Sequence, residues 1–112
     1  MKQFVVIFSF KVPLESIGEQ LMLQHLAHLR KGYELGYILL YGPREPERGT
    51  LAVVRAESRQ ALGTALASDP LLRTGIATYD FMEFIPVKYP SSLQGWVNPL
   101  EFHQTAPPEF EE

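Results

Sequence analysis

The sequence contains no cysteine among its 112 residues. This absence excludes disulfides, thiolate catalysis, iron–sulfur clusters and zinc sites built on cysteine. It also fits a cytoplasmic location, where disulfides are rare. Any chemistry must therefore come from histidine, carboxylate, hydroxyl or amine side chains.

The sequence also lacks an excess of positive charge and a long hydrophobic run. Lys and Arg number 10 against 13 Asp and Glu, so the net charge is -3, which does not suit a phosphate backbone, and we expect no nucleic-acid partner. The apolar segment 4–10 is far shorter than the roughly 20 residues that cross a bilayer, and Lys11 and Pro13 follow where a signal-peptide cleavage site would need small residues. We expect no membrane association.

Glycine-rich phosphate loops are missing as well. The sequence contains neither Gly-x-Gly-x-x-Gly nor a Walker motif, so a nucleotide cofactor has no support and we expect no cofactor. The chain length allows one domain, because domains usually have roughly 100 to 200 residues.

Six segments have a regular pattern. Segment 4–10 is rich in β-branched and aromatic residues and predicts a strand. From Leu14 to Leu35 the apolar residues recur at helical spacing, and Gly36 ends this helix, although Gly18 lets its regular part begin near Glu19. The remaining predicted elements are a strand at 37–41, a strand at 51–56, a helix from Ser58 to about Ala67, and a strand at 79–87.

The predicted order is β-α-β-β-α-β. This order indicates an α+β, ferredoxin-like domain over residues 1–89, with both helices on one face of a four-stranded antiparallel sheet. The strands are apolar at odd and even positions alike, so the second sheet face also needs a cover. A second copy of the chain is the expected cover, and a lid formed by the extension 90–112 is the alternative. Trp96 and Phe102 indicate that part of this extension docks on the body or on the partner.

His25 lies in the middle of the apolar stripe of the first helix. A polar side chain there needs a partner, because an unsatisfied group costs about 1 to 3 kcal/mol. Two interpretations stay open from position alone. His25 is either a core histidine bonded to a backbone carbonyl or a general base or acid in a pocket.

Asp69 is the natural partner for His25. It continues the buried face of the second helix, although before Pro70 it can equally act as the N-cap of a short turn. The two helices of this fold run antiparallel, so the start of the first lies beside the end of the second. His25 and Asp69 are therefore expected to approach each other. His28, three residues after His25, could complete a metal site with them, but this spacing is common by chance and we predict no metal.

The order of short motifs resembles the YCII-related (YciI-like) family. The resemblance rests on the segments His25-Leu26-Ala27-His28-Leu29, Gly36 to Pro43, and Asp69 to Ile76, and it covers residues 2 to 88. It implies a dimeric α/β barrel with His25 and Asp69 as an active-site pair. One position departs from the family, because Met22 stands where members often carry Arg.

The resulting hypothesis is a small cofactor-independent enzyme of lyase or isomerase type, acting on a small cyclic or carbonyl compound. His25 moves the proton, Asp69 orients it, and Met22, His28, Tyr41 and Arg44 line the pocket. A non-catalytic small-molecule binding or accessory protein is the alternative, and a monooxygenase of the dimeric barrel class is a further one.

Overall fold

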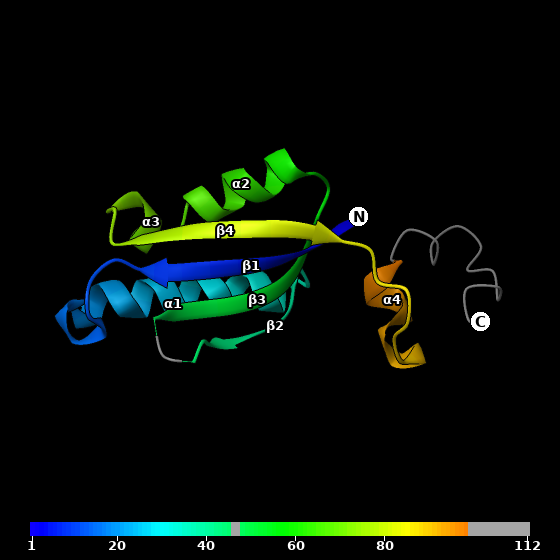
Figure 1. Cartoon of the computed structure of the whole chain (residues 1–112), viewed down its shortest axis with the longest axis horizontal. Helices are drawn as coiled ribbons and strands as arrows, with labels where there is room; N and C mark the ends of the chain where they lie inside the picture. The colour runs from blue at the N-terminus through cyan, green and yellow to red at the C-terminus, as the bar shows by residue number, and fades with distance from the viewer. Residues whose placement is uncertain (46–47, 99–112) are drawn as a thin grey trace.

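The computed structural model describes residues 1–45 and 48–98. Figure 1 shows a four-stranded sheet with helices packed behind it and a short C-terminal helix beyond one end. The elements are β1 (Lys2–Phe10), η1 (Leu14–Ser16), α1 (Glu19–Glu34), β2 (Ile38–Pro43), β3 (Gly49–Ala56), α2 (Arg59–Ala67), α3 (Pro70–Arg73), β4 (Ala77–Phe84), η2 (Ser91–Leu93) and α4 (Gln94–Val97).

The sheet has the strand order β2-β3-β1-β4, and its pairs are antiparallel. In the centre of the sheet, Val6 of β1 lies opposite Ala52 of β3 and Phe81 of β4. This topology confirms the predicted α+β, ferredoxin-like fold.

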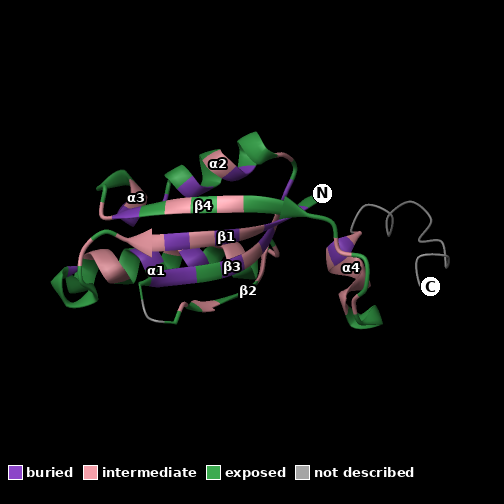
Figure 2. Cartoon of the chain, in the orientation of Figure 1, coloured by how far each residue is buried: buried purple, intermediate pink, exposed green. Residues whose placement is uncertain are grey.

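One face of the sheet forms the core with the helices. Phe4, Val6 and Phe8 are buried on this face and pack in one cluster with Leu29 of α1 and Leu62 of α2. Figure 2 shows the resulting alternation of buried and partly exposed positions along β1. The period of two in β1 therefore directs every second side chain to the helices.

The centre of the opposite face of the sheet is apolar and open in the single chain, whereas the end of this face at Gln3 and Arg55 is covered by the C-terminal segment. By register, Val5 and Ile7 of β1 share this face with Leu51 and Val53 of β3 and with Met82 of β4. Leu51 and Met82 are exposed. Burying such a surface is favourable at about 25 cal/mol per Å² of apolar area, so this face is suited to a cover.

Two predicted boundaries need correction. The first helix begins at Glu19 with Gly18 as its N-cap, whereas Leu14 lies in a separate 3-10 turn and is exposed. Strand β4 runs from Ala77 to Phe84 instead of 79–87. Its pairing with β1 ends at Phe84, because Pro86 has no N–H for the ladder and disfavours a helical or paired continuation.

Gly49 fixes the start of β3 against β1. Its backbone has φ +152°, and a Cβ at this position would lie 1.9 Å from the carbonyl oxygen of Phe8. Arg48, which precedes Gly49, is also bonded to β1, because the Phe10 N–H donates to the Arg48 carbonyl at 2.7 Å. Only glycine allows this close approach of the two strands.

The C-terminal segment docks where β1 begins. The buried side chain of Gln3 donates to the Val97 carbonyl at 3.0 Å, and Trp96 Nε1–H donates to the Gly36 carbonyl at 3.1 Å. Arg55 lies between them and donates to the carbonyls of Gly36 at 2.8 Å and Trp96 at 2.6 Å. Phe102, the other aromatic residue expected to dock, lies outside the described residues.

Candidate active site

The side chains of His25 and Asp69 meet at the junction of α1 with the loop that follows α2. The distance from His25 Nδ1 to Asp69 Oδ2 is 2.8 Å. Both side chains are almost completely buried, with exposed fractions of 1% for His25 and 0% for Asp69. A charge-assisted hydrogen bond of this length fits a carboxylate that accepts from an imidazole N–H.

Asp69 also caps the short helix α3. Its other carboxylate oxygen, Oδ1, accepts from the backbone N–H of Leu71 at 2.8 Å, and Pro70 occupies the first helical position. Burial alone would raise the pKa of Asp69. The hydrogen bonds from His25 and Leu71, together with the nearby Nδ1 of His28 at 3.4 Å, outweigh burial and hold the pKa of Asp69 well below its ordinary value. Asp69 is therefore ionised at neutral pH.

The His25 ring is oriented by its neighbours. Nδ1–H donates to Asp69, so in the neutral ring the lone pair is on Nε2. The ring meets Phe8 edge to face, with centroids 5.8 Å apart. Nε2 is buried and has no hydrogen-bond partner among the described residues. This nitrogen keeps a free lone pair, and its surface is closed to solvent in the structure.

A cavity of about 320 Å³ adjoins His25. Met22 and Leu26 of α1 line it together with Tyr41 of β2 and Phe10 of β1. This volume is within the range of about 300 to 1,000 Å³ that is usual for small-molecule sites. The cavity thus brings together three residues predicted from sequence, namely His25, Met22 and Tyr41.

The structure places the two other predicted pocket residues elsewhere. His28 lines a separate apolar cavity of about 370 Å³, bordered by residues of α1, α2 and the sheet, together with Ser68. Arg44 donates from Nη2 to Ser9 Oγ at 3.0 Å, and Ser9 lies on the open face of the sheet. Arg44 is absent from the residues that line the His25 cavity, because strand alternation directs its side chain to the face opposite that of Tyr41, while its backbone N–H still donates to the Gly49 carbonyl of β3.

Sequence reasoning missed Ser68. Its hydroxyl donates to the Ala65 carbonyl at 2.7 Å and lies 2.9 Å from His28 Nε2. A serine in the last turn of a helix commonly bonds back to the helix in this way, so the residue type alone gives no signal of a role at the site.

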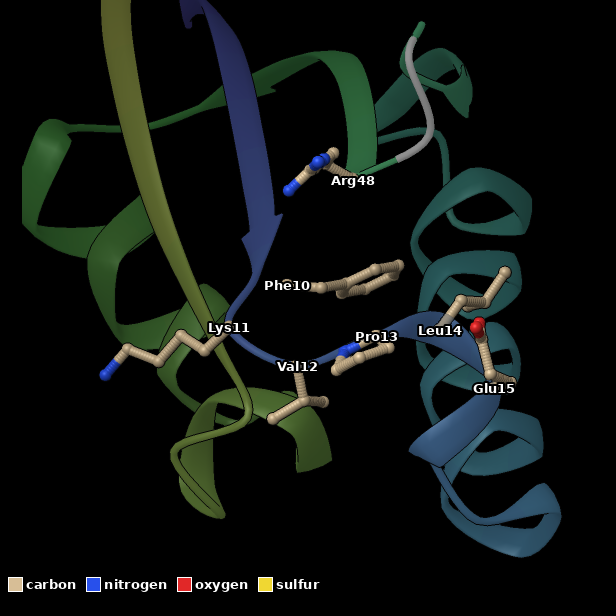
Figure 3. A pocket seen from close by; sticks show the side chains of 7 residues that line it. All are labelled: Phe10, Lys11, Val12, Pro13, Leu14, Glu15 and Arg48. Atoms are coloured by element: carbon tan, nitrogen blue, oxygen red, sulfur yellow. The ribbon is translucent and has the colours of Figure 1, made fainter.

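A third cavity, of about 420 Å³, adjoins the His25 cavity. Phe10 and Leu14 line both of them. Figure 3 shows the Phe10 ring between Arg48 and Pro13, while the side chain of Lys11 points away from the ring. This cavity lies at the β1–η1 turn and contains neither His25 nor Asp69.

Metal ligation has no support in the geometry. Within residues 1–45 and 48–98, no three His, Asp or Glu side chains are arranged to hold a metal ion. The Nδ1 atoms of His25 and His28 both face the same oxygen of Asp69, which suits two donors and one acceptor rather than three ligands around an ion.

The family follows from a comparison of the sequence with family models. The YCII-related domain model matches residues 3–85, which is most of the chain. The chain belongs to the YCII-related family. The match includes His25 and Asp69 and ends before the docked segment that carries Trp96. No curated protein matches this YCII-related chain.

Solved structures share the fold at low sequence identity. One is a 5-chloro-2-hydroxyhydroquinone dehydrochlorinase from Burkholderia phenoliruptrix in complex with 2,5-dihydroxybenzoquinone, 16% identical, with a TM-score of 0.61 over 80% of this chain and 97% of that chain. Another is a muconolactone isomerase, 18% identical, with a TM-score of 0.63 over 81% of this chain and 94% of that chain. The fold of this chain is the ferredoxin-like fold of the dimeric α/β barrel proteins.

No helix within the described residues is both long and apolar enough to cross a membrane.

Proposed function

We propose that this YCII-related protein is a small enzyme of lyase or isomerase type that moves a proton on a small cyclic or carbonyl compound. The observation that carries the proposal is the unpartnered Nε2 of His25, in a ring whose Nδ1–H is held by an ionised Asp69. A general base needs a fixed lone pair beside a cavity that can hold the substrate. His25 lines a cavity of about 320 Å³.

In the proposed reaction, Nε2 of His25 takes a proton from a carbon next to a carbonyl group. The electron pair of the broken C–H bond passes toward the carbonyl oxygen and forms an enolate. Where the enolate is conjugated with a carbon–carbon double bond, the imidazolium returns the proton to the far carbon of that bond, which isomerises the substrate. Where the carbon next to the enolate carries a leaving group, the enolate expels that group as an anion, and the imidazolium gives its proton to the anion or to water, which completes an elimination. Asp69 stays ionised and stabilises the imidazolium.

The lining of the cavity fits an apolar ring with one polar substituent. Met22 and Leu26 provide apolar contacts, and the hydroxyl of Tyr41 is a donor that suits an enolate oxygen. The two structures of similar fold are named for a dehydrochlorination and an isomerisation of ring compounds. Their names agree with the proposed reaction class.

The experiment that tests this function is the substitution His25→Gln. We expect loss of at least about 100-fold in turnover of an accepted cyclic ketone, enol or lactone, because general-base catalysis contributes about 10² to 10⁴ in rate. The melting temperature and circular dichroism should show a folded protein. Met22→Leu is the control, since it alters the same cavity without removing the base. Full turnover by His25→Gln would refute the proposal.

A non-catalytic binding role is the second candidate, and the burial of the pair favours it. An exposed fraction of 1% for His25 leaves almost none of the ring accessible, including the side that borders the cavity. If the pair is structural, His25→Gln and Asp69→Asn lower the melting temperature while retention of a bound ring compound stays unchanged.

The proposed working molecule is a homodimer. The open sheet face carries Val5, Ile7, Leu51 and Met82, and a second copy of the same face is a self-complementary cover under two-fold symmetry. Two ferredoxin-like sheets packed in this way form the dimeric barrel.

A further inference from the structure

One oxygen of Asp69 faces two histidines. Oδ2 lies 2.8 Å from Nδ1 of His25 and 3.4 Å from Nδ1 of His28. The other oxygen, Oδ1, is occupied by the backbone N–H of Leu71. His28 is the less buried of the two rings, with an exposed side-chain fraction of 32%.

The orientation of the His28 ring follows from its second contact. Its Nε2 lies 2.9 Å from Ser68 Oγ, which holds the ring with Nδ1 toward Asp69. A lone pair on Nδ1 would face an ionised carboxylate in a buried position, and such a contact is repulsive. Nδ1 of His28 therefore carries a proton and lies 3.4 Å from Oδ2, in a charge contact that does not have the geometry of a hydrogen bond.

Ser68 accommodates both protonation states of His28. In the charged ring, Nε2–H donates to Ser68 Oγ while the hydroxyl donates to the Ala65 carbonyl. In the neutral ring, the hydroxyl of Ser68 turns and donates to Nε2. The contact of Nδ1–H with Asp69 is kept in both cases.

We propose that His28, held by Ser68, is a positioning residue that shares Asp69 Oδ2 with His25 and limits the strength of the Asp69–His25 hydrogen bond. This inference rests on the proposed function and deepens it, since it names two residues that act on the base through its carboxylate. The two hydrogen bonds from His25 and Leu71 fix the plane of the carboxylate, and the longer contact of 3.4 Å from His28 Nδ1 competes electrostatically for Oδ2.

Other polar groups near the two rings are few. Tyr41 of β2 lines the cavity of His25, and Lys31 of α1 lines the cavity of His28, as does Arg55 of β3. None of them has a hydrogen bond to Asp69 or to either ring among the described contacts. The shared carboxylate is therefore the direct link between the two histidines.

Two variants of His28 separate its contacts. In His28→Asn the side-chain amide can occupy the position of Nδ1 and keep a donor toward Asp69. In His28→Gln the longer amide reaches the position of Nε2 and keeps the contact with Ser68 but not the donor to Asp69. Both substitutions are at a half-exposed position of α1, so the fold should tolerate them.

The measurement is the proton NMR signal of His25 Nδ1–H at constant pH, assigned by its absence in His25→Gln. We expect this signal further downfield in His28→Gln, because Oδ2 loses a competing donor and the bond to His25 shortens. In His28→Asn it should stay near its wild-type position. If the substitutions acted only by disturbing helix α1, His28→Asn would change the His25 signal more than His28→Gln, since Asn is the weaker helix former.

Two results would count against the inference in different ways. Equal shifts in wild type, His28→Asn and His28→Gln would overturn the role of His28 and leave the His25–Asp69 pair in place. If the Nδ1–H signal of His25 is missing from the wild-type protein, the pair itself is refuted, and the proposed function with it.

Discussion

At the scale of the residue, Asp69 combines a structural and a chemical task in one side chain. Oδ1 caps α3 through the Leu71 N–H, and Oδ2 accepts from His25. From the sequence, the helix cap and the partner of His25 are alternative roles of Asp69. In the structure each role uses a different carboxylate oxygen, so the two roles coexist. A substitution at Asp69 therefore affects stability as well as chemistry.

The low pKa of Asp69 makes folding stability depend on pH. In the folded chain this carboxyl stays ionised at a pH where the unfolded chain binds a proton, so the free energy of unfolding falls as pH falls below the ordinary aspartate value of about 4. Asp69→Asn should cost about 2 kcal/mol at pH 7, because a charged acceptor is lost. The difference between wild type and Asp69→Asn should then shrink toward pH 2.

Urea unfolding of both proteins between pH 7 and pH 2 measures this difference. Glu57→Gln is the control, because Glu57 is an exposed carboxylate. A difference between wild type and Asp69→Asn that does not change with pH would contradict the proposed ionisation of Asp69.

At the scale of the element, one arginine makes several of the contacts that hold the helix α4. Arg55 donates to the carbonyls of Gly36 and Trp96, and its guanidinium lies 5.2 Å from the centroid of the Trp96 ring. A cation over an aromatic face adds to these hydrogen bonds. Arg55 thus connects the end of α1 to a segment about 60 residues later.

Trp96 is the single tryptophan of the chain and reports on this contact. We expect Arg55→Ala to shift the fluorescence emission of Trp96 to longer wavelength, because the ring loses its cover and becomes more exposed to water. Arg59→Ala is the matched control, since Arg59 lies 4.8 Å from the Phe81 ring and has no contact with α4 among the described interactions. Unchanged emission in Arg55→Ala would show that α4 docks without this arginine.

At the scale of the whole molecule, the open face of the sheet determines the proposed assembly. Buried apolar positions face the helices, and a second apolar set faces outward without a cover in the single chain. Exposed apolar surface of this kind is a usual sign of an interface.

Leu51→Glu tests the assembly. Leu51 has an exposed fraction of 37% on the open face, and a buried, unpaired carboxylate between two sheets is costly. We expect wild type to sediment as a dimer and Leu51→Glu as a monomer. Leu23→Glu is the control, because Leu23 on α1 is 58% exposed and lies away from the sheet. A wild-type monomer, or a dimer of Leu51→Glu, would rule out this interface.

Part of the fold and site follows from sequence for physical reasons. Strand and helix periods predicted the element order, and antiparallel helices predicted that His25 and Asp69 approach each other. The prediction that Arg44 shares a pocket with Tyr41 is wrong because it ignored strand alternation, which directs residues three apart to opposite faces of the sheet. Neither was the contact of His28 with Ser68, since it depends on how the last turn of α2 is rotated against α1.

The contacts of Gln3 have a practical consequence for shortened versions of the protein. A chain cut at residue 89, near the edge of the family match, would leave the buried Gln3 amide without the Val97 carbonyl and would remove two acceptors of Arg55, the carbonyls of Gly95 and Trp96. Each hydrogen bond lost in this way costs about 0.5 to 1.5 kcal/mol, since water can replace the missing acceptor. A truncation that keeps these contacts should therefore retain Asn98, whose backbone N–H donates to the Gln94 carbonyl of α4.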